Sequence, residues 1–158
     1  MKRYLKICIY ARYLILYLEE NHYFCSIVTI KLFLTMLEVG LKHNSVMRVE
    51  AGNTAEFIGS GDMAVLATPA MVALMENAAM LAVALHLGEG ETTVGSMIST
   101  SHLKPSKVGN VVEARAELTE VDGRKLTFKI SAYDGETLIG EGDHVRFVVN
   151  REKFLSKL

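Results

Sequence analysis

The 158-residue chain has only two cysteines, Cys8 and Cys25, which are too few and too far apart for a zinc site or a disulfide framework. Its 17 basic and 18 acidic side chains give a formal net charge of −1, so it has no electrostatic footprint for nucleic acid. It also has no glycine-rich phosphate loop, nucleophile elbow or dinucleotide-binding fingerprint. These absences predict a soluble globular domain in a reducing compartment, the cytoplasm, without nucleic acid as a partner.

The first 35 residues differ in composition from the rest. They hold both cysteines, five of the six tyrosines and no glycine. Their five basic and two acidic residues give a net charge of +3, which leaves a net charge of −4 for 36–158. Arg12 splits the first apolar run, and no A-x-A-like cleavage site follows, which argues against a signal peptide. The runs 13–18 and 27–34 are shorter than the ~20 residues of a membrane span. We expect 1–35 to be an appendage to the domain at 36–158, such as upstream sequence from a misplaced start; a docked helix and a membrane-surface anchor are the alternatives.

One long helix is predicted over 69–87. Thr68 is expected at its N-cap, with Pro69 at the first helical position and Gly88 as the terminator. Almost every position is apolar, and the central exceptions are Glu76 and Asn77. A helix that is apolar all round is typical of a buried element, so we expect a sheet to cover it.

The second half of the chain predicts strands, because it is rich in β-branched and aromatic residues. Asp-Gly pairs at 122–123 and 134–135 indicate tight hairpins. We expect a short strand at 46–50, loops at 51–54 and 59–62, and strands at 92–103, 111–121, 125–133 and 137–149. The predicted fold class is α+β, with an antiparallel meander wrapped around the buried helix.

Glu76 is the most informative residue, because a carboxylate is costly to remove from water unless it is paired or neutralised. Its position in an apolar helix has two interpretations. In the first, its side chain reaches solvent or a dimer interface, or caps a backbone group. In the second, it is a carboxylate placed for general-base or nucleophilic work.

Three other residues carry little weight by themselves. His102 ends a predicted strand after the hydroxyl cluster 99–101, which suggests a lined cavity, although a lone strand histidine is more often structural. Thr68 is explained by helix capping. Arg146 alternates onto the same strand face as His144, and by itself it is interpreted as a solvated or edge charge. The remaining histidines are too scattered to suggest a metal site.

In combination, these residues resemble a known family. Segments 67–72, 74–78 and 102–105, followed by the meander, are similar in order and spacing to hotdog-fold acyl-CoA thioesterases, most of all to the fluoroacetyl-CoA thioesterase branch. The resemblance covers about 44–152. It implies a hotdog fold and hydrolysis of an acyl-CoA thioester to free acid and CoA, with no cofactor and no metal.

The resemblance also implies site residues. Thr68, Glu76 and His102 correspond to the catalytic residues of the family, without indicating whether Thr68, Glu76 or water makes the attack. Gly95 corresponds to a glycine whose backbone contacts the acyl thioester, and Arg146 to an arginine that faces the substrate.

The sequence departs from the family in one place and leaves a rival function open. The loop 59–62, which reads Gly-Ser-Gly-Asp, lacks the aromatic gate of the fluoroacetate-specific enzyme, so we expect a different small acyl-CoA. A hotdog hydratase would carry Asp at the position of Lys104, which makes that activity unfavoured. The alternative function is a non-catalytic acyl-CoA-binding or regulatory hotdog module.

Thr68 and Glu76 are eight residues apart, which corresponds to about 12 Å along a helix. For both to act at one site, either Thr68 lies on a loop that folds back, or the two residues come from different chains. We expect the second arrangement, in a homodimer or a dimer of dimers.

Overall fold

The computed structural model describes residues 37–158. The predictions made for 1–35, including the appendage and both cysteines, lie outside the described residues. Within 37–158, no helix has the length and hydropathy needed to cross a membrane.

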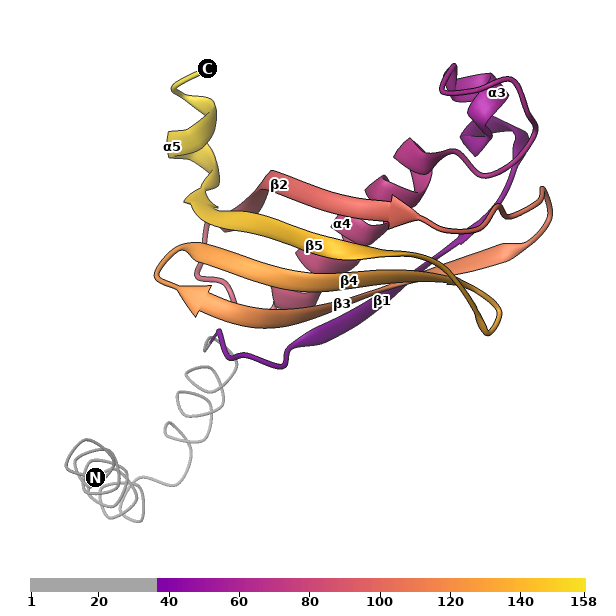
Figure 1. The fold of residues 1–158 in the computed structure, drawn as a ribbon. Coiled ribbons are helices and arrows are strands. Elements are labelled where there is room, and N and C mark those ends of the chain that lie inside the picture. The colour runs from indigo at the N-terminus through magenta and orange to yellow at the C-terminus, as the bar shows by residue number, and fades with distance from the viewer. Residues whose placement is uncertain (1–36) are drawn as a thin grey trace, which may run out of the picture. The chain divides into compact units, whose positions relative to one another are not determined.

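The architecture is a five-stranded antiparallel sheet with one long helix against it (Figure 1). The strands are β1 (Lys42–Arg48), β2 (Glu91–His102), β3 (Val111–Asp122), β4 (Lys125–Asp134) and β5 (Thr137–Asn150). Their order in the sheet is β1-β3-β4-β5-β2. The two Asp-Gly hairpins form as predicted, and Gly123 and Gly135 both have positive φ angles, of 56° and 60°, as these tight turns require.

Strand β2 is not the neighbour of the strand that follows it. It pairs with β5 from Glu91–Asn150 to His102–Gly140, so the segment 103–110 is a crossing connection rather than a hairpin. The meander therefore consists of β3, β4 and β5, and β2 occupies the edge beyond β5. A register shift between Gly95 and Met97 marks a bulge in this edge strand.

The long helix, α4, spans Thr68–Ala84. Its buried residues follow a helical period and form one face: Ala70, Met71, Leu74, Met75, Ala78, Ala79, Ala82 and Val83. The opposite face is also largely apolar, yet Ala73 and Ala84 are exposed and Leu81 is 38% exposed. The helix ends at Ala84, three residues before the predicted end, with Leu85 as its C-cap.

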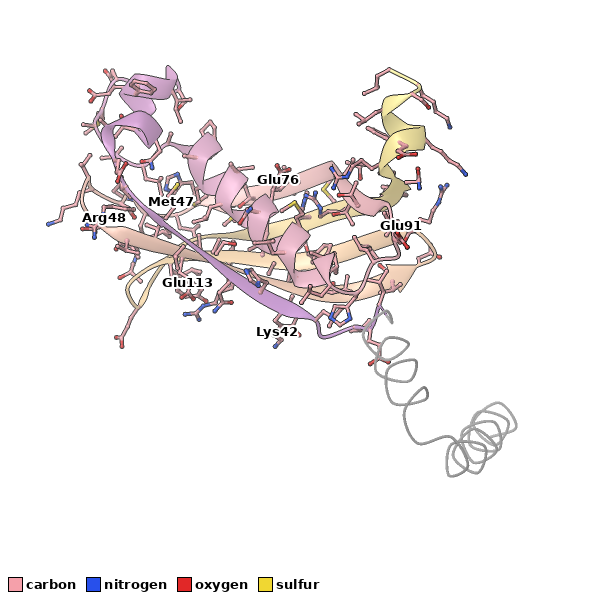
Figure 2. All side chains as sticks on the ribbon, turned by 180° about the vertical axis from the view of Figure 1, so that it is seen from behind. Lys42, Met47, Arg48, Glu76, Glu91 and Glu113 are labelled. Atoms are coloured by element: carbon pink, nitrogen blue, oxygen red, sulfur yellow. The ribbon has the colours of Figure 1, made fainter. Side chains whose placement is uncertain are left out.

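Helix α4 lies mainly over β1 and β3, with less contact to β4 and little to β2 or β5. Figure 2, which views the molecule from behind, shows the helix in front of the sheet, with Glu76 on the side turned away from β1. The inner surface of β5 and β2 therefore has less contact with the helix, although Met71 and Met75 reach it at Gly140 and Thr100. This is the part of the fold on which polar side chains gather.

Three short helical segments were not predicted: η1 (Ala51–Asn53), α3 (Ala55–Ile58) and α5 (Arg151–Leu155). Each is too short to produce a hydrophobic period. A capping signal was present for α5, because the Asn150 side chain accepts a hydrogen bond from the Lys153 amide. Strand β1 starts at Lys42, four residues before the predicted strand.

Candidate active site

Thr68 and His102 form the first polar group of the site. Thr68 is the first residue of α4, and its Oγ1 lies 2.9 Å from His102 Nδ1 at the end of β2. The predicted capping role of Thr68 is wrong, because the N-cap is Ala67 and no side chain caps the helix. The hydroxyl is therefore free to contact the imidazole, an arrangement in which a histidine can exchange a proton with the hydroxyl.

A pocket of about 300 Å³ lies beside this pair. Its wall includes Ser60 of the loop 59–62, Leu66, Leu103 and Lys104, together with Thr68 and His102 themselves. Within the described part of the chain, the buried Nε2 of His102 has no hydrogen-bond partner. A larger groove of about 650 Å³ on the solvent side of the sheet contains none of the five predicted site residues.

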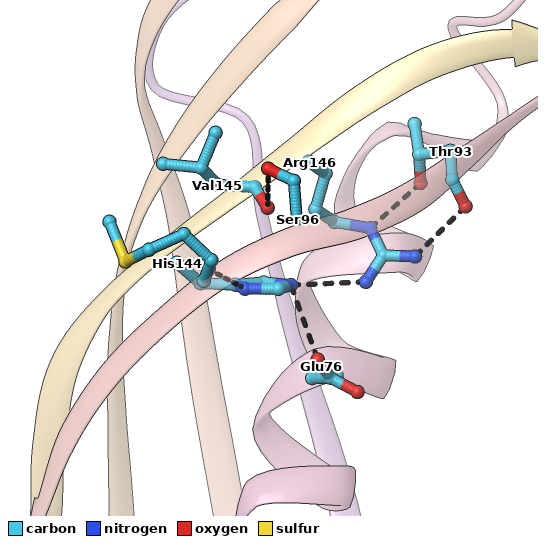
Figure 3. A network of polar contacts seen from close by, with 7 residues as sticks. Glu76, Thr93, Ser96, His144, Val145 and Arg146 are labelled. Atoms are coloured by element: carbon cyan, nitrogen blue, oxygen red, sulfur yellow. Dashed lines mark hydrogen bonds and ion pairs between the residues drawn. The ribbon is translucent and has the colours of Figure 1, made fainter.

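Arg146 belongs to a second polar group and is only 6% exposed. Its Nε donates to Thr93 Oγ1 at 2.8 Å, and Nη2 donates to the Thr93 carbonyl oxygen at 2.9 Å. Its Nη1 lies 3.0 Å from Nε2 of His144. Figure 3 shows this contact as a dashed line. The interpretation of Arg146 as a solvated or edge charge is therefore wrong, because the side chain is buried and its guanidinium bonds to Thr93 of β2 and to His144.

The hydrogen bonds of His144 define its tautomer. A guanidinium can only donate, so Nε2 accepts from Arg146, and Nδ1 carries the proton that it donates to the Met97 carbonyl oxygen at 2.8 Å. Burial lowers the pKa of this fully buried imidazole. The charge of Arg146 lowers the pKa further, whereas the bond to Met97 and the carboxylate of Glu76 act in the opposite direction. His144 is therefore neutral at pH 7.

Glu76 and Gly95 complete the second group. The Glu76 side chain is 42% exposed, and its Oε1 lies 4.0 Å from His144 Nε2. Because His144 is neutral, this contact is not an ion pair. A Cβ at position 95 would lie 3.2 Å from both Glu76 Oε1 and His144 Cε1 and 3.7 Å from Arg146 Nη1, so glycine is what lets these groups approach the backbone of β2.

The predicted residues thus fall into two groups within one chain. Glu76, Gly95 and Arg146 come together, and Thr68 and His102 come together. Thr68 and Glu76 are on the same helix, so about 12 Å separates the two groups along its axis. Sequence reasoning did not identify His144 as a site residue; the signal available was its alternation with Arg146 on β5.

The lowered pKa of His144 predicts a loss of stability in acid. Below the ordinary value of 6.5, the unfolded chain takes up a proton that the folded chain does not. The free energy of unfolding should then fall with decreasing pH, by up to about 1.4 kcal/mol per pH unit, until the folded-state pKa is reached. Urea unfolding at pH 7.5, 6.5 and 5.5 measures this slope. His144→Gln cannot titrate and should flatten it, and equal slopes in the two proteins would contradict the assignment.

Comparison with known proteins gives a consistent result. Residues 49–152 match the sequence profile of the fluoroacetyl-CoA-specific thioesterase family. Over 94 residues the chain is 43% identical to the fluoroacetyl-CoA thioesterase of Streptantibioticus cattleyicolor. This matched region is 60% of this chain and 68% of that enzyme. A solved fluoroacetyl-CoA thioesterase structure has a TM-score of 0.72 at 34% identity, covering 77% of this chain and 95% of that chain.

More distant structures share the fold. A thioesterase superfamily member from Thermus thermophilus has a TM-score of 0.72 at 26% identity, covering 77% of this chain and 90% of that chain. A hot-dog-like protein from Thermanaerovibrio acidaminovorans has a TM-score of 0.70 at 21% identity with the same coverage. The predicted α+β hotdog fold is thereby confirmed. The chain belongs to the fluoroacetyl-CoA-specific thioesterase family and is an acyl-CoA thioesterase.

Proposed function

We propose that this thioesterase hydrolyses a small acyl-CoA to the free acid and CoA, with Thr68, Glu76 and His102 as its catalytic residues. The observation that carries the proposal is the exposed Glu76 carboxylate beside the buried cation Arg146 and the backbone of Gly95. We also propose that residues 36–158 form the catalytic domain and that residues 1–35 are an appendage to it. The proposal also keeps the sequence-based expectations of a cytoplasmic location and of catalysis without cofactor or metal.

Thioester hydrolysis requires attack on the carbonyl carbon, stabilisation of the oxyanion and protonation of the leaving thiolate. The Gly95 N–H is proposed as the oxyanion donor, since no side chain blocks the approach of substrate to this backbone. Glu76 supplies a carboxylate that can attack directly or activate water. Thr68 and His102, which contact each other, orient the attacking group and deliver the proton on which the C–S bond cleavage depends.

The proposed substrate is a small acyl-CoA that is not restricted to fluoroacetyl-CoA. The loop 59–62, in which the sequence has no aromatic residue, contributes Ser60 to the wall of the pocket. Phe57 of α3, the aromatic residue nearest to this loop in the sequence, is 72% exposed and is not part of the pocket wall. Among the related structures, one variant of the fluoroacetyl-CoA enzyme is in complex with acetyl-CoA, and another is in complex with fluoroacetate and CoA.

We further propose that the site is shared between two copies of the chain. Thr68 lies within α4, so it is not on a loop that folds back toward Glu76. Two surfaces are suited to a second copy: the partly exposed apolar face of α4 that includes Leu81, and the edge of β2, which pairs only with β5. A two-fold axis there would bring Thr68 and His102 of one chain to Glu76 of the other.

Glu76→Gln should lower turnover by about 100-fold or more, because the amide keeps the shape of the side chain but cannot act as a base or nucleophile. Thiol release from a panel of acyl-CoA thioesters measures this effect. Glu136→Gln, in the exposed turn between β4 and β5, is the matched control and should behave as wild type. Turnover of Glu76→Gln within a few-fold of wild type would refute its role. Binding without thiol release by the wild type would favour the non-catalytic module.

Mixing Thr68→Val and Glu76→Gln chains tests the shared site. In a mixed dimer, one site then carries both lesions and the other is native. Random exchange of equal amounts makes half of the dimers mixed, so about a quarter of wild-type activity should return. Mass spectrometry of intact dimers confirms the exchange. If both residues act within one chain, every site retains a lesion, and no activity returns.

A further inference from the structure

His144 is a fully buried polar side chain to which the proposed catalytic steps assign no role. The groups that face its ring come from four elements. The Met97 carbonyl comes from β2, the Phe128 ring from β4 with a centroid distance of 6.4 Å, Glu76 from α4, and Arg146 from β5 itself. Arg146 and Glu76 are the charged groups among them, and both approach Nε2, at 3.0 and 4.0 Å.

Arg146 is held by neutral acceptors alone. Thr93 accepts two of its hydrogen bonds and His144 accepts the third. Within 37–158, no carboxylate lies within ion-pair distance of the guanidinium, although the charge of Glu76 acts on it. A guanidinium has five N–H groups, so one remains on Nη1 and one on Nη2. The bond to His144 is what holds Nη1 near Gly95.

We propose that neutral His144 is a positioning residue that holds Nη1 of Arg146 at Gly95, so that its free N–H is presented to the thioester bound there. This inference rests on the proposed function of the site. Thr93 holds Nε and Nη2 of the guanidinium, and His144 holds Nη1, the nitrogen that faces the substrate. Without the acceptor at Nε2, the planar guanidinium is held only along its Nε–Nη2 edge by Thr93, and it can tilt about this edge and bring Nη1 toward Glu76.

The same geometry makes the positioning sensitive to acid. A proton on Nε2 of His144 removes the acceptor of Arg146 and directs a donor at Glu76 Oε1, which is 4.0 Å away. The Arg146–His144 bond and a His144–Glu76 ion pair are therefore mutually exclusive. Protonation of His144 displaces the guanidinium and ties up the proposed catalytic carboxylate in one step.

Two substitutions separate positioning from packing. His144→Gln keeps an acceptor that can reach Arg146 and does not titrate, whereas His144→Leu fills space without an acceptor. We expect His144→Gln to retain kcat/KM within about 5-fold and His144→Leu to lose about 100-fold, the scale of losing one donor to an oxyanion. On the acid side of its pH profile, kcat/KM should fall more steeply in wild type than in His144→Gln. The reason is that only wild type carries a titrating imidazole at position 144.

A double-mutant comparison tests the route through Arg146. In an Arg146→Met background, His144→Leu should cause little further loss, because the group that it positions is already gone. Nitrogen NMR of the histidine-labelled wild-type protein should show His144 as the neutral Nδ1–H tautomer at pH 7.5, a result that needs no variant to fold. The Nε2–H tautomer, or additive losses in the double variant, would overturn the proposal.

The outcomes also separate this proposal from the proposed function. Wild-type activity in folded His144→Leu, together with an inactive Glu76→Gln, overturns the positioning role alone. Equal loss in folded His144→Gln and His144→Leu also overturns it, since the restored acceptor then has no effect. Absence of thiol release by the wild type contradicts the proposed function, while the tautomer measurement still tests the contact between His144 and Arg146.

Discussion

The burial of the Arg146 guanidinium constrains the whole region around it. A cation that is 6% exposed needs hydrogen-bond acceptors, and Thr93 of β2 and His144 of β5 accept from three of its five N–H groups. Because the guanidinium only donates, His144 must be neutral, and its other nitrogen must donate to Met97. The small residue at position 95 follows from the same crowding, since a Cβ there would press on Glu76 and His144.

The way α4 covers the sheet explains where this polar region can exist. The buried face of α4 packs mainly on β1 and β3, where the inner residues of the sheet are small or apolar. Over β5 and β2 the helix contributes Met71 and Met75, which reach Gly140 and Thr100. It also contributes Glu76, which stays 42% exposed. An apolar helix face that is partly open to solvent and an edge strand with one neighbour flank this region. In the proposed dimer, a second copy covers both and brings its Thr68–His102 pair within reach of Glu76.

The sequence was sufficient for the elements with strong local signals. The Asp-Gly turns predicted β3, β4 and β5, and the apolar run predicted α4, because turn chemistry and composition act over neighbouring residues. The place of β2 beside β5 was not predicted, because the order of strands in the sheet is decided by pairing between residues 38 to 59 positions apart in the chain. The same non-local pairing buries Arg146 and gives His144 its partners, so neither could be recognised from alternation along β5 alone. Thr68 was assigned to a cap because its contact with His102 also joins distant segments.

We propose that one chain carries only part of the active site. The most direct test measures mass and activity together over a dilution series, with sedimentation velocity for the mass and thiol release for the activity. We expect turnover per chain to be constant while the protein sediments as a dimer or larger assembly, and to fall in proportion as single chains appear. Single chains that keep the full turnover of the dimer would contradict it.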